Sequence, residues 1–124
     1  MKTVTFDFDS TLTKKEVQDY AKSLIKKGFD VWIVTSRYDD IHLIKPIIRD
    51  NTDLYKVAEN IGIPRHKIRF TCMRDKSEYL FRANVLWHLD DDWVEIDSIK
   101  LETDVIAIDV TRSNWKQKCN SLLE

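Results

Sequence analysis

Apolar positions along the chain alternate between short continuous runs and stripes at helical spacing. The continuous or alternating runs predict strands, which lie at about 3–9, 31–35, 67–72, 85–89 and 105–110. The stripes between them predict helices, which lie at about 13–28, 53–62, 75–83, 92–101 and 113–123. Strands that alternate with helices of this length indicate a parallel sheet with helices on both faces. We therefore expect a three-layer, Rossmann-like α/β fold with about five strands.

Local signals predict where the first helices begin and end. A capping-box pattern from Thr13 to Glu16 opens the first helix, and Gly28 is its natural C-terminal stop. Asp53 is expected to cap the second helix, which ends at Gly62. The stretch at 38–52 has a mixed pattern, and its proline, Pro46, argues against one uninterrupted helix there.

The length and composition of the chain indicate a single domain with a net charge close to zero. A chain of 124 residues with 43% apolar side chains can close one hydrophobic core, so we expect a single domain over 1–124. Because 20 basic residues nearly balance 21 acidic ones, no general field attracts nucleic acid or an anionic membrane. Only two glycines are present, which excludes glycine-rich phosphate-binding loops.

Nothing in the sequence suggests a membrane span or a secretory signal. No apolar run approaches the roughly 20 residues that a membrane helix needs, and Met1 leads directly into a strand pattern. The two cysteines, Cys72 and Cys119, fit a reducing compartment better than a disulfide framework. We therefore expect a cytoplasmic protein with no membrane partner.

Polar side chains gather where the predicted strands end. In a parallel sheet the carboxyl ends of the strands form one edge, and ligands bind there. The candidate site residues that follow the first, second, third and fourth strands are Asp7, Asp9, Thr35, Ser36, Arg37, Lys76, Asp90, Asp91 and Asp92.

This set of side chains suits phosphoryl chemistry that depends on a metal ion. Carboxylates that lie close together repel one another unless a cation or a shared proton neutralises them, and Mg²⁺ prefers such oxygen ligands. Lys76 and the Thr35 hydroxyl could then hold a substrate phosphate. One of the aspartates Asp7 and Asp9 could act as a nucleophile while the other transfers a proton.

These residues, in this order, resemble the four motifs of the haloacid dehalogenase superfamily of phosphohydrolases, which use an aspartate nucleophile. Asp7-x-Asp9-x-Thr11 resembles the family's first motif, and the run Val-Trp-Ile-Val that ends at Thr35 resembles the second. Lys76 resembles the third motif, and the acidic group after the fourth strand resembles the last. The resemblance extends from residue 3 to about residue 99, and implies that the first strand lies between the second and the fourth.

The resemblance also implies roles for the acidic residues. Asp7 would be the nucleophile, and Asp9 would be first the general acid and then the general base. Mg²⁺ would be held by the side chain of Asp7, the backbone carbonyl of Asp9 and the side chain of Asp90. Asp91 would contribute directly or through water. The product of the first step would be an aspartyl phosphate.

Further residues would hold the transferring phosphoryl group. The resemblance implies this role for Thr35 and for Lys76, which would also steady the nucleophile. Ser36 and Arg37 follow directly on the same rim. Arg37 could contact the substrate phosphate or form a surface salt bridge, and the sequence leaves both possibilities open.

The chain departs from the family pattern in two respects. Ser10 stands where relatives often have glycine. The span from Asp7 to Thr35 is almost filled by one helix, and the span from there to Lys76 has no room for an independent domain. The chain therefore resembles an uncapped member. Such members act on large phosphorylated substrates, such as a nucleic-acid end or a protein, or are covered by a partner subunit. A nucleotide substrate also stays open.

Two other functions compete with a phosphatase. Response-regulator receivers share the length, the α/β alternation and the clustered aspartates, but they carry the acceptor aspartate after the third strand and a lysine after the fifth. Here those strands end near Thr71 and Asp109. A catalytically silent binding domain of the same fold is the other alternative. His88 lies within an apolar run and is expected to be a core histidine with a hydrogen-bonding partner.

Overall fold

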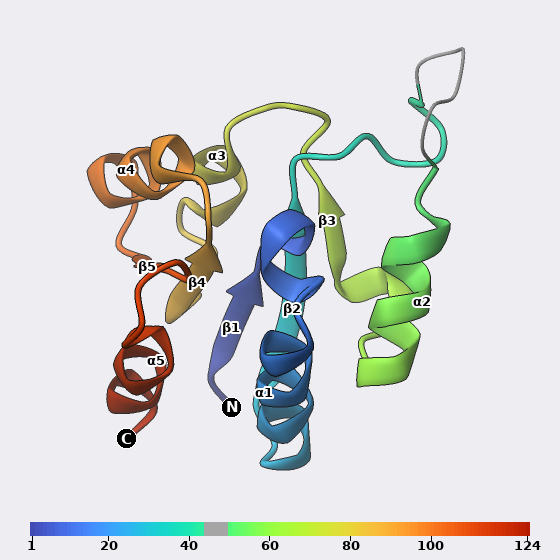
Figure 1. The fold of residues 1–124 in the computed structure, drawn as a ribbon. Coiled ribbons are helices and arrows are strands. Elements are labelled where there is room, and N and C mark those ends of the chain that lie inside the picture. The colour runs from blue at the N-terminus through green and yellow to red at the C-terminus, as the bar shows by residue number, and fades with distance from the viewer. Residues whose placement is uncertain (44–49) are drawn as a thin grey trace.

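The computed structural model describes residues 1–43 and 50–124, which form an α/β fold around a five-stranded sheet. The strands, listed in chain order, are β1 (Thr3–Phe6), β2 (Asp30–Thr35), β3 (Ile68–Phe70), β4 (Trp87–Asp90) and β5 (Ile106–Asp109). Their order across the sheet is β3-β2-β1-β4-β5, and every neighbouring pair is parallel (Figure 1). The first strand therefore lies between the second and the fourth, as expected. The predicted effect of Pro46 lies outside the described residues.

Within residues 1–43 and 50–124, five α-helices flank this sheet, and apolar side chains are divided between two cores. They are α1 (Lys15–Lys26), α2 (Thr52–Ile61), α3 (Lys76–Leu80), α4 (Trp93–Glu102) and α5 (Trp115–Leu123). Buried side chains of α1, α2 and α5 join the larger core, and those of α3 and α4 join the smaller one. Figure 1 shows α3 and α4 together near β4 and β5, while α1 lies by β1 and β2. Among the described residues, no helix is long and apolar enough to cross a bilayer.

The two cores follow from the alternation of side chains along each strand. Successive residues of a strand point to opposite faces of the sheet. In β2, Ile33 therefore joins the larger core and Val34 the smaller one. Trp87 of β4 is fully buried in the larger core, where its ring packs edge-on against Phe6 and stacks on Tyr20. Apolar side chains are thus buried on both faces of the sheet, which explains the continuous apolar run in β2.

The helix ends agree with the sequence better than the helix starts do. Gly28 and Gly62 have φ angles of 94° and 103°, a left-handed conformation that glycine adopts without a steric penalty. By contrast, α1 begins after Lys14, and no side chain caps it. The predicted cap, Thr13, instead closes the preceding turn through its N–H, which donates to the Phe8 carbonyl at 3.3 Å.

The larger core predicts a large difference between two leucine truncations. Leu24 of α1 is fully buried, whereas Leu101 of α4 is 85% exposed. We expect Leu24→Ala to lower the free energy of unfolding by about 2–5 kcal/mol, because it leaves a cavity. Leu101→Ala should change it by less than about 0.5 kcal/mol. Urea unfolding followed by tryptophan fluorescence measures both, and equal losses would contradict this placement of the core.

Candidate active site

Most of the predicted site residues line one cleft at the carboxyl ends of the strands. The cleft lies where β1, β2 and β4 end, beside the first turns of α3 and α4. Its lining includes Asp7, Asp9, Ser36, Lys76, Asp90 and Asp91. The side chain of Thr35 is fully buried below the cleft, and its hydroxyl oxygen accepts a hydrogen bond from the N–H of Arg37 at 3.3 Å.

The chain turns sharply after β1 and thereby separates the two aspartates of the first motif. The predicted strand at 3–9 ends at Phe6, because the backbone folds into a turn over Phe8–Leu12. This turn is closed by the N–H of Leu12, which donates to the Asp7 carbonyl at 3.3 Å. Ser10 has a φ angle of 60°, so a residue other than glycine occupies a left-handed position there. The alternating pattern of the sequence hides this turn.

The ammonium group of Lys76 lies between two buried carboxylates. Its Nζ donates to Asp7 Oδ1 at 2.8 Å and to Asp90 Oδ2 at 2.5 Å. The exposed fractions of the three side chains are 3% for Lys76, 7% for Asp7 and 0% for Asp90. Charges removed from water in this way are stable only when they are paired and hydrogen-bonded. The lysine therefore holds the ends of β1 and β4 together electrostatically.

Asp90 is the more firmly ionised of the two carboxylates. Its Oδ1 accepts hydrogen bonds from the N–H groups of Asp91 at 2.9 Å and Asp92 at 3.1 Å. Burial opposes its ionisation, but the contacts with His88 and Lys76 outweigh burial and hold the pKa of Asp90 well below its usual range.

His88 extends this network into the sheet. Its ring is fully buried, with Nδ1 2.7 Å from Thr5 Oγ1 and Nε2 2.7 Å from Asp90 Oδ2. Burial is the main reason why the pKa of His88 is lowered. The expectation of a core histidine with a satisfied partner is confirmed. What the sequence analysis missed is that the partner is Asp90, although the two residues share one face of β4 by strand periodicity.

Asp7 differs from Asp90 because it has fewer donors. Burial raises the pKa of Asp7 to about 8, and the charge of Asp90 and the nearby carboxyl of Asp91 add to this effect, while Lys76 opposes it. Its Oδ2 accepts one hydrogen bond from the Thr11 hydroxyl, at 3.1 Å. In the absence of a cation, the Asp7 carboxyl therefore keeps its proton at neutral pH.

The acidic side of the cleft fits a hard divalent cation. Ligand oxygens of Asp7, Asp90 and Asp91 all lie within 4.8 Å of one another. Two of these carboxyl groups are buried, and burial first, with the charge of Asp90 in addition, raises the pKa of Asp7. A cation with oxygen ligands would compensate for the charge of the ionised carboxylates, so these residues suit Mg²⁺.

Arg37 pairs with two carboxylates in this structure. Its guanidinium donates to Asp9 Oδ2 at 2.9 Å and Oδ1 at 2.7 Å, and to Asp53 Oδ1 at 2.7 Å and Oδ2 at 3.0 Å. It also packs over the ring of Phe8, 4.8 Å from the centroid. Of the two roles that the sequence left open, the salt bridge is the one that the structure shows. The prediction that Asp53 caps the second helix is wrong, because Asp53 lies within the first turn of α2 and its carboxylate binds Arg37. The N-cap position is Asn51, whose side chain makes no capping hydrogen bond.

Glu95 is a site residue that the sequence analysis did not identify. Its Oε2 accepts the backbone N–H of Lys76 at 3.3 Å and lies 4.0 Å from that residue's Nζ. It belongs to the first turn of α4, where acidic residues are common for another reason, since they favour a helix N-terminus. Its position in the sequence therefore did not distinguish Glu95 as a site residue.

The raised pKa of Asp7 predicts how stability depends on pH without metal. Because the folded-state pKa lies above the ordinary value of 3.8, the contribution of Asp7 is greatest at low pH and is lost as the pH rises towards about 8. Between about pH 5 and pH 9, wild-type protein in EDTA should lose stability relative to Asp7→Asn. Urea unfolding at several pH values measures this difference. Parallel stability curves for the two proteins would contradict the assignment.

Comparisons with known proteins identify no relative of this chain. No family model matches it, and neither does any curated protein. The functions of the residues in the cleft must therefore be argued from their own geometry and chemistry.

Proposed function

We propose that this protein is a Mg²⁺-dependent phosphomonoester hydrolase that forms an aspartyl phosphate on Asp7. One observation carries the proposal, namely the position of the Lys76 ammonium between Asp7 and Asp90 at the floor of an open cleft. A lysine placed there orients one carboxylate and leaves positive charge beside it, which suits the approach of a phosphoryl group. The resemblance to haloacid dehalogenase phosphohydrolases supports the same roles.

In this proposal the metal ion would be held by the side chains of Asp7, Asp90 and Asp91, and by the backbone carbonyl of Asp9. Bound Mg²⁺ supplies positive charge that lets an anionic nucleophile approach an anionic phosphate. Its binding requires the proton on Asp7 to leave, because a carboxylate ligand must be ionised.

Asp7 and Asp9 divide the chemistry between them. An Asp7 oxygen bonds to phosphorus while the bond from phosphorus to the ester oxygen breaks, and Asp9 donates a proton to the departing oxygen. Asp9 then removes a proton from water, which attacks the phosphorus and releases inorganic phosphate from Asp7. Since Arg37 now holds the Asp9 carboxylate, this role requires Asp9 to turn from the guanidinium towards the leaving group.

The phosphate-binding side of the site would consist of Thr35, Ser36 and Lys76. Ser36 lines the cleft directly, and Thr35 ends the neighbouring strand. Arg37 would join them only by giving up a carboxylate partner. We therefore assign Lys76 the main part in binding the phosphoryl oxygens, because its ammonium already lies beside Asp7.

The open cleft favours a phosphate carried by a large molecule. Among the described residues, the span from β2 to α3 contains only α2, the short helical turn Arg65–Lys67 and β3, so no extra domain covers the site there. The rim carries the exposed apolar side chains of Met73, Trp93 and Val94. A nucleic-acid end or a nucleotide would suit this rim, because a base can stack on an exposed indole.

Position argues against a receiver-like signalling domain. A receiver would need its phosphorylated aspartate at the end of β3, where this chain has Thr71, and its lysine at the end of β5, where it has Asp109. Both aspartates of the first motif are present, which favours a catalyst over a silent binding domain. An activity measurement decides between these two.

Phosphate release tests the proposal most directly. The panel should include p-nitrophenyl phosphate, nucleotides, sugar phosphates and 3′-phosphorylated oligonucleotides, each with Mg²⁺ and with EDTA. We expect Mg²⁺-dependent turnover that falls by roughly 10³-fold or more in Asp7→Asn, because the amide is not a nucleophile.

Asp104→Asn is the matched control for this substitution. Asp104 is an exposed carboxylate just before β5, at the edge of the sheet opposite the cleft, so the variant should retain full activity. Turnover that survives in Asp7→Asn would contradict the nucleophile. No turnover on any substrate, in folded protein that binds Mg²⁺, would favour the binding-domain alternative.

A further inference from the structure

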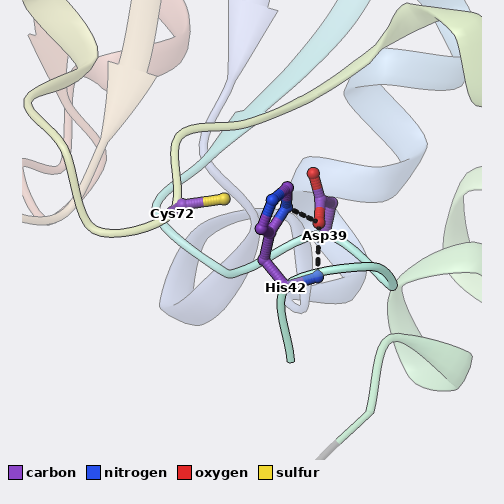
Figure 2. Close-up of side chains that lie close together, drawn as sticks. All are labelled: Asp39, His42 and Cys72. Atoms are coloured by element: carbon purple, nitrogen blue, oxygen red, sulfur yellow. Dashed lines mark hydrogen bonds and ion pairs between the residues drawn. The ribbon is translucent and has the colours of Figure 1, made fainter. Parts of the chain in front are cut away.

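We propose that Asp39, His42 and Cys72 form a second metal site, which binds a borderline transition metal ion such as Zn²⁺. The site joins the loop after β2 to the loop after β3 (Figure 2). None of its three ligands is among the residues that line the cleft. The proposal is independent of the phosphatase mechanism, since it rests on three side chains that have no part in that mechanism.

The three side chains already face a common point. One ligand atom from each lies within 4.8 Å of the others. His42 Nδ1 is 2.7 Å from Asp39 Oδ1, and the backbone N–H of His42 donates to the same oxygen at 2.9 Å. Figure 2 shows the Cys72 sulfur pointing from the opposite loop towards the imidazole and the carboxylate.

These three ligands favour a different metal ion from the one that the acidic cleft favours. A thiolate, an imidazole and a carboxylate together suit Zn²⁺, whereas three carboxylates suit Mg²⁺. Tetrahedral zinc with bonds of about 2.0–2.3 Å would draw the three groups closer than they are now. Because both groups would become ligands, zinc would replace the hydrogen bond between His42 Nδ1 and Asp39 Oδ1. Three protein ligands leave a fourth position for water.

The backbone around Cys72 is held independently of any ion. The N–H of Cys72 donates to the Arg37 carbonyl at 3.1 Å, and the N–H of Met73 donates to the Ser36 carbonyl at 2.8 Å. Cys72 itself has a φ angle of 53°, a left-handed conformation that is uncommon for a residue with a side chain. Such conformations persist where surrounding bonds impose them, so the loop presents the thiol in a fixed direction.

The ligands are open to solvent, so an ion could enter without unfolding. The His42 side chain is 65% exposed, that of Asp39 is 35% exposed, and Cys72 is half-buried. By contrast, the other cysteine, Cys119, is fully buried in the larger core. The chain thus offers a built-in comparison between a thiol at the proposed site and a thiol remote from it.

Metal binding here would act on the neighbouring cleft. Ser36 and Met73 both line the cleft. The Met73 N–H donates a hydrogen bond to the Ser36 carbonyl and so joins the two loops. An ion bound by Cys72 on one loop and His42 on the other would clamp these loops together. Zinc would therefore reinforce the backbone hydrogen bonds that already join these two loops.

Cobalt titration of the full chain tests the site. Co²⁺ substitutes for zinc and gives an intense thiolate charge-transfer absorption only when sulfur is a ligand. We expect this band to saturate at about one Co²⁺ per chain, to disappear in Cys72→Ser, and to persist in Cys119→Ala. His42→Ala should weaken binding roughly tenfold or more. Added Zn²⁺ should displace the cobalt.

A second measurement uses the unaltered protein and so does not depend on the folding of a variant. Because Cys119 is buried, iodoacetamide modification of native protein reports on Cys72. We expect Zn²⁺ to protect this thiol and Mg²⁺ to leave it reactive. The proposal is overturned if wild-type protein shows no thiolate band, if the band survives Cys72→Ser, if His42→Ala binds as tightly as wild type, or if Zn²⁺ gives no protection.

Discussion

The Lys76 ammonium is the interaction on which the rest of the site depends. Two carboxyl groups, Asp7 after β1 and Asp90 of β4, are buried beside it, and the ionised one, Asp90, could not stay there without an opposite charge. The free energy of desolvation is large for all three groups, so the hydrogen bonds must be short and well directed. Backbone pairing sets the two strand ends side by side, and the lysine fixes how their side chains lie relative to each other.

Much of the fold could be predicted because it depends on periodic patterns. The runs at 31–35 and 85–89 are continuous and apolar, and both became central strands of a parallel sheet. Element boundaries were less predictable. The alternation at 3–9 continues through a turn, so no hydrophobic signal marks the point where β1 ends. Likewise, Thr13 fits a capping pattern, but it ends the preceding turn, where its backbone is helical and its N–H donates to the Phe8 carbonyl.

The sequence predicts which side chains gather at the carboxyl ends of the strands, but not which of them bind one another. Asp7 and Asp90 come together because β1 and β4 are neighbours, and the family resemblance supplied Lys76. The partners of Arg37 could not be predicted, because several acidic residues follow the strand ends at the same edge of the sheet and Asp53 comes from another element. The structure shows that Asp9 and Asp53 hold it, so the proposed acid is tied to α2 in this state. The proposed mechanism requires Asp9 to face the leaving group, whereas this ion pair holds its carboxylate against Arg37.

The unequal size of the two cores has a consequence for how the molecule unfolds. The smaller core consists of six buried apolar side chains, and α3, which carries Lys76, packs within it. Such a layer would ordinarily open before the larger one, as a separate unit of lower stability. Here its opening would withdraw the ammonium from Asp7 and Asp90 and leave the buried charge of Asp90 without its cation. The charged cluster therefore couples the two layers, so that this side of the protein opens cooperatively with the whole.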